Sequence, residues 1–350
     1  MEKIKGVNLG GWLVLEKWMH PALFDGVNAD CFDETTFSTC LNDTEKQARL
    51  KVHRDTFITL NDFRWIKRAG LNSVRIPVPH WIFGDCPPYV GCIEYLDEAF
   101  DWAEKTGLTI LIDLHTAPGC QNGFDNGGIT GVCDWYKKPA YIDRTIEVLE
   151  MLCRRYRDRS ALLGIELLNE PSWDNPFEIV RDFTIRACQA CRAILKKEHL
   201  IVFHDSFRLE KWENLLTGPD YENVVLDTHL YQCFDDGLNA LSPEENAKIA
   251  LIDRRDLLDR ASRFHRIIVG EWSLGLADNE HWQRLSRAGH MLAMRAFCDA
   301  QLLTQERCMG WYFWSYKLIR LPKDPESEPG LDGWNYRDLT EQGIIPRWDA

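Results

Sequence analysis

The stretch Leu-Gly-Ile-Glu-Leu-Leu-Asn-Glu-Pro at residues 163–171 joins a short apolar run to an amide, a carboxylate and a proline. Apolar runs of this length are typical of strands in a parallel sheet, which are buried on both faces. Similar runs occur at residues 4–9, 72–77, 108–113, 200–203, 224–227, 267–270 and 309–314. The sequence therefore predicts eight strands.

Stretches with the periodicity of amphipathic helices separate these runs. They include residues 57–69, 93–106, 142–156, 177–197 and 247–264. Eight strands alternating with helices predict an α/β fold, a (β/α)8 TIM barrel, in preference to an open sheet. No linker or change of composition divides the chain, so we expect a single domain over residues 1–350 with long loops over the C-terminal face. The tail from Leu321, rich in Pro, Asp and Gly, is predicted to form a loop and a cap over one end.

Composition narrows the class of protein. With 350 residues, 45% of them apolar and 27% charged, the chain is globular and can bury a large core. A net charge of −13 makes nucleic acid and anionic membrane surfaces poor partners, and no apolar run is long enough to predict a membrane span. No secretory leader precedes the 12 Cys, which predicts a cytoplasmic protein with reduced thiols, or a secreted one if a leader has been removed. We expect a monomer.

Polar groups follow every predicted strand, at the end where (β/α)8 barrels carry their active sites. A charged residue at one such position is ordinary for a loop, but a set at all eight indicates a shared site. In chain order they are Asn8 and Glu16, Arg75 and His80, Asp113 and His115, Asn169 and Glu170, His204 and Asp205, His229 and Tyr231, Glu271, and Trp314.

Glu170 and Glu271 follow the fourth and seventh strands, and their carboxyl groups are expected to meet over a shared cavity. Glycoside hydrolysis needs such a pair, because one carboxyl group must donate a proton while the other stays ionised. Arg75 is available to keep one of them ionised. Metal-dependent hydrolysis is the competing use of His and carboxylates, but the chain has no His-Glu-x-x-His motif, and it has no Gly-x-Ser-x-Gly elbow for a serine nucleophile. We therefore expect neither a metal nor a cofactor.

Other conspicuous residues are predicted to be structural. Glu166 lies four residues before Glu170 and is therefore expected on the same face of the strand, which favours an interior ion pair. Cys188-x-x-Cys191 lies in a helical pattern with no second cysteine pair, so it indicates the buried face of a helix more strongly than a zinc or redox site.

The residues resemble glycoside hydrolase family 5 over nearly the whole chain. The resemblance implies that Glu170 is the acid/base and Glu271 the nucleophile of a retaining β-glycosidase. It also implies that Arg75 and Tyr231 hold Glu271 ionised and that Asn169 donates to the sugar 2-hydroxyl. It rests on Leu168-Asn-Glu-Pro-Ser172, Val269-Gly-Glu-Trp-Ser273, Val74-Arg-Ile-Pro, Asp113-Leu-His115, the His229-x-Tyr231 pair and Phe313-Trp-Ser-Tyr-Lys.

Within that family the chain is most similar to the exo-β-1,3-glucanases, also called glucan 1,3-β-glucosidases. The similar segments are residues 6–16, 115–126 and 229–234 and the segment that begins at Trp334. The resemblance implies a substrate-binding set in which Glu16 and His115 hold sugar hydroxyls, Trp314 forms the floor under the ring, and Phe124 and Phe234 clamp the next sugar. The chain departs from the pattern in lacking a leader and in having Cys120 within the second segment.

Three hypotheses of function remain open. The first is an exo-acting β-glucosidase that removes β-1,3-linked glucose from non-reducing ends of glucans or oligosaccharides. The second keeps the chemistry but changes the leaving group to a small aglycone, a glycolipid or a disaccharide conjugate. The third is a carbohydrate-binding scaffold without catalysis, and the presence of both Glu170 and Glu271 argues against it.

Overall fold

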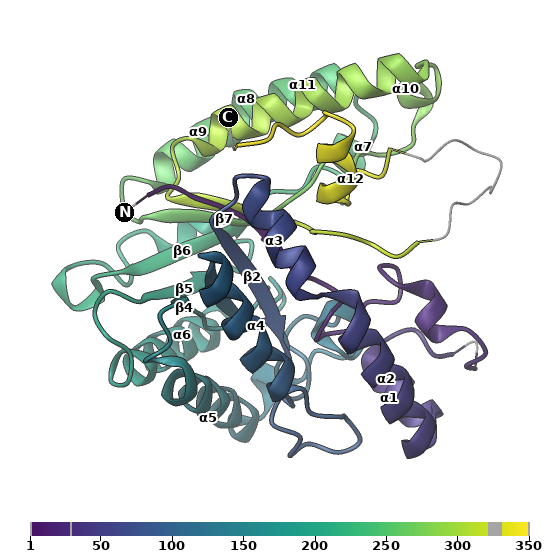
Figure 1. Cartoon of the computed structure of the whole chain (residues 1–350). Helices are drawn as coiled ribbons and strands as arrows, with labels where there is room; N and C mark the ends of the chain where they lie inside the picture. Colours follow the sequence, from purple (N-terminus) through teal and green to yellow (C-terminus); the bar gives the residue numbers. More distant parts are fainter. Residues whose placement is uncertain (1, 29, 321–330, 349–350) are drawn as a thin grey trace.

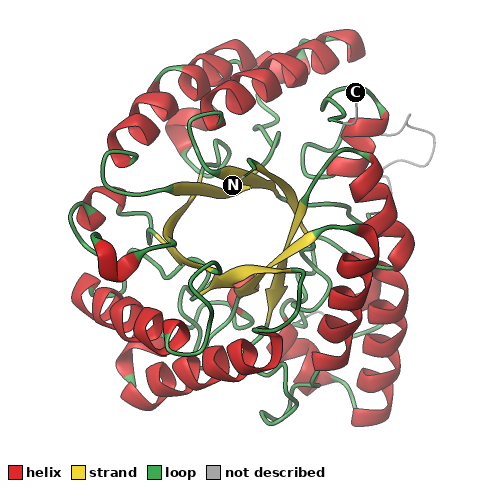
Figure 2. Ribbon diagram, turned by 60° about the vertical axis from the view of Figure 1, so that its left-hand side comes forward, coloured by secondary structure: helices red, strands yellow, loops and turns green. Residues whose placement is uncertain are grey.

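A computed structural model describes residues 2–28, 30–320 and 331–348 of the chain. Eight parallel strands close into a barrel in chain order, and the last strand pairs back with the first. Figure 2 shows the ring of strands with helices around it, so the predicted (β/α)8 architecture is confirmed. The strands are β1 (Ile4–Asn8), β2 (Ser73–Val78), β3 (Thr109–Leu114), β4 (Leu162–Glu166), β5 (Leu200–His204), β6 (Val224–His229), β7 (Ile267–Trp272) and β8 (Gly310–Phe313).

The α-helices wrap the outside of this ring (Figure 1). They are α1 (Glu34–Cys40), α2 (Asp43–Phe57), α3 (Leu60–Arg68), α4 (Ile93–Thr106), α5 (Pro139–Tyr156), α6 (Phe177–Arg192), α7 (Asp236–Asn239), α8 (Pro243–Leu251), α9 (Asp253–Ala261), α10 (Glu280–Gln283), α11 (Arg287–Gln305) and α12 (Tyr336–Glu341). Short 3-10 helices lie in the connections: η1 (Pro21–Phe24), η2 (Asp125–Gly127), η3 (Trp135–Lys137), η4 (Leu209–Trp212) and η5 (Pro219–Tyr221).

The single helix predicted over residues 247–264 is two helices in the structure. Ser242 starts α8 four residues earlier than expected, because its side chain accepts a hydrogen bond from the backbone N–H of Glu245. The chain then breaks at Ile252, which has a backbone φ of −110° and ψ of −66°, and α9 begins with Asp253. The apolar residues keep their helical spacing across Ile252, so the sequence pattern does not indicate the break.

Side-chain alternation along the strands decides what fills the barrel. Residues two apart on a strand share a face. On β2, Val74 and Ile76 pack outward in the main core under the helices, whereas Ser73 and Arg75 make their side-chain contacts with other strands inside the ring. A separate apolar cluster, Ile4, Leu111, Leu200, Val202, Val225, Ile268 and Tyr312, fills the barrel at one level. Two residues beyond Leu111, Val202 and Val225 the inward positions on β3, β5 and β6 are polar, at Asp113, His204 and Asp227, and this switch contributes to the site.

The described part of the tail, residues 331–348, includes α12 and contacts the C-terminal ends of the strands. The backbone N–H of Ser315, just after β8, donates to the carbonyl of Trp334, and the Trp334 ring lies 5.3 Å from that of Tyr231, just after β6. This agrees with the predicted cap, although residues 321–330 of the predicted tail lie outside the described residues.

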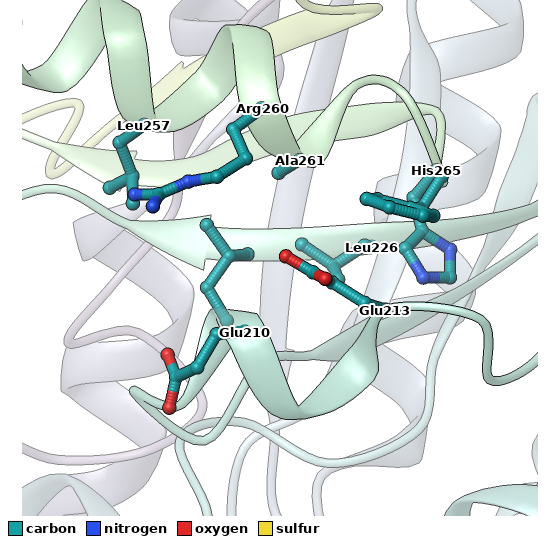
Figure 3. Close-up of a pocket in the computed structure, with 9 residues that line it drawn as sticks. Glu210, Glu213, Leu226, Leu257, Arg260, Ala261 and His265 are labelled. Atoms are coloured by element: carbon teal, nitrogen blue, oxygen red, sulfur yellow. The ribbon is translucent and has the colours of Figure 1, made fainter.

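Three further observations bear on function. None of the 12 cysteines forms a disulfide, and Cys188 and Cys191 are buried in α6, as predicted. Within the described ranges no helix combines the length and apolar character needed to cross a bilayer. A cavity of about 40 Å³ lies between η4 and α9 in the outer layer and is lined by Leu226, Leu257 and His265 among others (Figure 3). None of its lining residues belongs to the polar set at the strand ends.

Candidate active site

His229 brings the two predicted catalytic carboxyl groups together. Its Nδ1 lies 2.6 Å from Glu170 Oε1 and 3.4 Å from Glu271 Oε2. All three side chains are buried, with at most 8% of any of them exposed. The predicted convergence of Glu170 and Glu271 on one place is therefore present in the structure, although they come from positions 101 residues apart in the chain.

Glu271 is held from two sides. Arg75 Nη1 donates to its Oε1 at 2.9 Å, and the Tyr231 hydroxyl donates to its Oε2 at 2.8 Å. Burial and the negative charges nearby keep the pKa of Tyr231 well above its usual value, so the hydroxyl remains a donor. Glu170 has neither contact. Its other oxygen, Oε2, accepts from Asn126 Nδ2 at 3.0 Å.

Arg75 organises the layer below the two carboxyl groups. Its guanidinium donates to Glu166 through Nε at 2.7 Å and lies 3.1 Å from Asp113. This confirms the interior ion pair predicted for Glu166. The five N–H groups of a guanidinium point in fixed directions, so these contacts fix the orientation of Nη1 toward Glu271.

The same guanidinium orients the Asn169 amide. Arg75 Nη2 donates to Asn169 Oδ1 at 2.7 Å, which leaves the Nδ2 group as the only free end of the amide. That group is buried and has no hydrogen-bond partner. A flipped amide would place N–H groups against the guanidinium, so the contact with Arg75 determines which end is free. Asn169 therefore offers an unused donor beside Glu170.

His115 and Trp314 form a second part of the site. The ring of His115 stacks on Trp314 with centroids 5.5 Å apart and planes 7° apart. His115 Nδ1 lies 2.5 Å from Asp113 Oδ2, while Nε2 is buried without a partner. Burial lowers the pKa of His115 to about 3, so the ring is neutral, and donation from Nδ1 to Asp113 leaves Nε2 as an acceptor. A side chain at Gly10 would collide with the Trp314 ring, with a Cβ only 2.7 Å from its nearest atom.

Glu16 contributes another unused polar atom. Its Oε2 accepts from Trp18 Nε1 at 2.9 Å, whereas its Oε1 is buried without a partner. Burial, followed by the charge of Asp125, raises the pKa of Glu16 well above its usual value. Donors from a bound molecule would relieve this cost, because a buried carboxylate is stable only when it is hydrogen-bonded.

Phe124 and Phe234 lie in different aromatic groups. Phe234 is 76% exposed and contacts Tyr231 and Trp334, at centroid distances of 5.4 and 6.0 Å. Phe124 contacts Trp173 at 6.0 Å. Among the described residues no ring contact joins Phe124 to Phe234, so the predicted clamp would have to form around a ligand and not by direct contact between the two rings.

The proton of this cluster resides mainly on His229. Burial alone would lower the pKa of His229, but Glu271, Asp227 and Glu170 together raise it well above its usual value. Burial also acts against ionisation of Glu170, yet the hydrogen bond and charge of His229 hold its pKa below the usual range. Burial raises the pKa of Glu271, and the positive charge of His229 only partly opposes this. Each carboxyl group alone therefore departs from the direction that its predicted role needs, Glu170 because it contacts a protonated neighbour and Glu271 because it is buried.

Sequence reasoning missed two residues that touch this cluster. Asn126, which donates to Glu170, lies inside the segment 115–126 but carried no signal of its own. Asp227 comes two residues before His229, and its Oδ2 lies 3.5 Å from His229 Nε2. Its Oδ1 accepts from the backbone N–H of Gly270 at 2.6 Å. A Cβ on residue 270 would lie 1.9 Å from the Asp227 carboxylate, so only glycine fits there. Asp227 lies two residues before His229 on β6 and therefore shares its inward face, and this pattern could have identified it.

Two triplets of buried side chains are close enough to hold a metal ion: Glu170 with His204 and His229, and Glu166 with Asp227 and His229. His229 belongs to both. Its Nδ1 lies 2.6 Å from Glu170 and its Nε2 lies 3.5 Å from Asp227, so both ring nitrogens already face carboxyl groups.

Comparison with known proteins agrees with this chemistry. Residues 32–318 match the family described as Cellulase (glycosyl hydrolase family 5). The chain belongs to glycosyl hydrolase family 5. As a member of that family it is a glycoside hydrolase, and its substrate is a glycan or glycoside.

Relatives and solved structures extend the comparison of this family 5 enzyme. The chain is 36% identical to the probable glucan 1,3-beta-glucosidase A of Emericella nidulans, over 99% of this chain and 90% of the relative. It is 37% identical to the glucan 1,3-beta-glucosidase of Pichia angusta, over 99% and 86%. The rutinosidase of Aspergillus niger has the same fold, with a TM-score of 0.83 at 24% identity and coverage of 98% and 97%. The endoglucanase Cel5A of Thermotoga maritima also shares it, with a TM-score of 0.58 at 18% identity and coverage of 97% and 93%.

Proposed function

We propose that this enzyme is a retaining exo-β-glucosidase that removes β-1,3-linked glucose from the non-reducing ends of glucans or oligosaccharides. The observation that carries the proposal is the shared contact of Glu170 and Glu271 with His229 Nδ1. Because 2.6 Å and 3.4 Å separate their oxygens from one nitrogen, these oxygens lie at most about 6 Å apart. Retaining enzymes need about 5–5.5 Å between the two carboxyl groups, and inverting enzymes need about 6.5 Å or more.

Glu271 is the nucleophile and Glu170 the acid/base in this proposal. Arg75 and Tyr231 donate to Glu271 and to no oxygen of Glu170, so they favour the ionised form of Glu271. In the first step a Glu271 oxygen bonds to the anomeric carbon while the bond to the leaving oxygen breaks. The leaving oxygen takes a proton from the Glu170 and His229 pair, and the sugar remains as a glycosyl ester on Glu271.

Water completes the reaction in the second step. Once Glu271 is esterified its charge is gone, so Glu170 can act as a base and accept a proton from the attacking water. The water oxygen bonds to the anomeric carbon and Glu271 leaves as a carboxylate. Both displacements invert the anomeric carbon, and the product keeps the β configuration of the substrate.

The unused polar atoms around the two carboxyl groups support recognition of a single sugar. Asn169 Nδ2 is placed to donate to the 2-hydroxyl, where hydrogen bonds strengthen as the transition state forms. His115 Nε2 and Glu16 Oε1 are acceptors for other hydroxyls. The names of the relatives support β-1,3-linked glucose as the substrate and exo action as the mode of cleavage.

The product profile from laminarin, a β-1,3-glucan, tests the proposal, with Glu271→Gln as the control. Release of glucose alone as the β anomer in early NMR spectra, and its loss in the variant, is the expected result. Release of the α anomer would contradict retention, and longer products would contradict exo action. Cleavage of an aryl β-glucoside without cleavage of laminarin would move the substrate to small glucosides.

A further inference from the structure

The connection between β1 and β2 holds more helices than the barrel needs. It contains α1, α2 and α3, whereas one helix after each strand completes a (β/α)8 barrel. Because α3 packs beside α4 in the outer ring, α1 and α2 are the additions. The first residue of α1 is Glu34, and it contacts the loop that carries Glu16.

Glu34 holds that loop through its carboxyl group. Its Oε2 accepts from the backbone N–H of Leu15 at 2.8 Å, and Leu15 directly precedes Glu16 in the chain. Both residues of this contact are buried, with none of Glu34 and 2% of Leu15 exposed. Burial keeps water from replacing the acceptor, so the Leu15 N–H would lose its partner without Glu34.

The same carboxyl group contributes little as an ion pair. Its Oε1 lies 3.8 Å from Arg54 Nη2, beyond hydrogen-bond distance. Arg54 donates instead to the carbonyls of Val90 and Gly91, at 3.2 and 2.9 Å. Burial raises the pKa of Glu34 to about 7, and the charge of Arg54 opposes this only in part. An apolar side chain of similar volume would stabilise such a buried position at least as well. What Glu34 adds is therefore the hydrogen bond to Leu15.

Asp33, at the N-cap of α1, holds the neighbouring loop in the same way. Its Oδ2 accepts from the backbone N–H of Thr130 at 2.8 Å. Thr130 lies just after η2 in the loop that follows β3, and from this loop Asn126 donates to Glu170. The start of α1 therefore joins the loop of Glu16 to the loop that contacts the acid/base.

Glu16 lies between two anchored neighbours. Leu15 is held by Glu34, and Lys17 Nζ donates to the Cys31 carbonyl at 2.8 Å. The Oε1 atom of Glu16 is buried without a partner, as expected of an acceptor that awaits a ligand. Hydrogen bonds weaken steeply with distance and angle, so this carboxylate must be in place before a sugar arrives.

We propose that Glu34 is a positioning residue for substrate binding, whose hydrogen bond to Leu15 holds the Glu16 carboxylate against the hydroxyls of the terminal sugar. The inference rests on the proposed function, in which Glu16 Oε1 accepts from such a hydroxyl. Glu34 touches neither the substrate nor the reacting atoms and acts only through Glu16. Its loss weakens binding of the substrate and the transition state alike, which raises KM and leaves kcat unchanged.

A double-mutant cycle measured with p-nitrophenyl β-glucoside on the full-length enzyme tests the proposal. Glu16→Gln should raise KM about 10- to 100-fold, the usual strength of a hydrogen bond to a charged group. Glu34→Leu should raise KM about threefold to tenfold, with kcat within about twofold of the unchanged enzyme. In the Glu16→Gln background, Glu34→Leu should change KM by less than about twofold, because no carboxylate remains to be positioned.

Two further variants separate the hydrogen bond from a general effect on α1. Glu34→Gln keeps an oxygen acceptor for Leu15 and should bring KM back to within about twofold of the unchanged enzyme. Thr36→Val is the matched control, because Thr36 Oγ1 accepts from the backbone N–H of Asp33 at 3.0 Å and does not contact Leu15. Its KM should stay within about twofold even where urea unfolding shows a loss of stability. If Glu34→Leu does not fold, Glu34→Asp takes its place, since its carboxyl group is one carbon too short to reach Leu15.

The outcomes distinguish the inference from the proposed function. Equal KM values for Glu34→Leu and the unchanged enzyme would overturn the inference and leave the proposed function intact, and so would the same increase in KM in both backgrounds. A loss in Glu34→Gln as large as that in Glu34→Leu would exclude the hydrogen bond to Leu15 as the cause. An unchanged KM in Glu16→Gln, or failure of the unchanged enzyme to cleave the substrate, would contradict the proposed function, and the inference with it.

Discussion

His229 Nδ1 donates a 2.6 Å hydrogen bond to Glu170 Oε1 inside the mouth of the barrel. The imidazole is positively charged because three carboxyl groups surround it, so Glu170 is not an isolated acid. One proton serves the pair, and its position decides whether the site can protonate a leaving group.

Glu170→Gln should separate substrates by their need for that proton. We expect kcat/KM for laminaribiose to fall about 10²- to 10⁴-fold, the usual contribution of a general acid. The value for 2,4-dinitrophenyl β-glucoside should fall much less, because its leaving group departs as a stable anion. Initial rates on both substrates give the comparison. An equal loss on the two would mean that Glu170 does not act as the acid.

Asp227→Asn should change the pH dependence of the reaction. Asp227 lies 3.5 Å from His229 Nε2, and removing its charge lowers the pKa of His229. The shared proton is then lost at a lower pH, so the basic limb of kcat/KM should move to lower pH by about one unit. Glu170, Glu271, Glu166 and His204 still lie beside the ring. Asp62→Asn, a buried carboxyl group at the start of α3, is the control, and an unchanged profile in Asp227→Asn would exclude this role.

Asn169→Ala should remove the contact with the sugar 2-hydroxyl. Its Nδ2 is unpaired while its Oδ1 is held by Arg75, so we expect kcat/KM for an aryl β-glucoside to fall about 100-fold. On the 2-deoxyglucoside the variant and the unchanged enzyme should differ by less than about fivefold. Asn8→Ala also removes an acceptor of Arg75, at 2.9 Å, and should affect the two substrates equally. If Asn169→Ala did the same, its amide would not reach the 2-hydroxyl.

His53→Gln should reduce the sensitivity of the fold to acid. His53 lies 2.8 Å from the Gly11 carbonyl through Nε2, and burial lowers its pKa to about 3. The unfolded chain binds a proton at His53 near pH 6.5 and the folded chain does not, so its contribution is complete above that pH and is lost as the pH falls toward 3. Between pH 7 and about pH 4.5, the free energy of unfolding in urea should fall by about 2–3 kcal/mol less in the variant than in the unchanged enzyme. An equal loss would show that another group takes up the proton.

The barrel could be predicted from the sequence because each of its elements has a local sequence pattern. Each strand and most helices have their own pattern, and α4 falls on its predicted bounds, Ile93–Thr106. The break at Ile252 was not predicted, because the helical spacing of apolar residues continues through it. Strand-end position also predicted that Glu170, Glu271, Arg75, Asn169, His229 and Tyr231 lie together, because all eight strands of a barrel end on one face.

The sequence by itself determined the order of the eight strands, the set of polar groups at the strand ends and the family to which the chain belongs. Only the tertiary structure decided which of these groups touch. It placed His229 against both carboxyl groups, left Asn169 Nδ2 without a partner and put Phe124 and Phe234 in different aromatic groups. Contacts of this kind join residues far apart in the chain, and closure of the ring sets their distances. No local pattern encodes them.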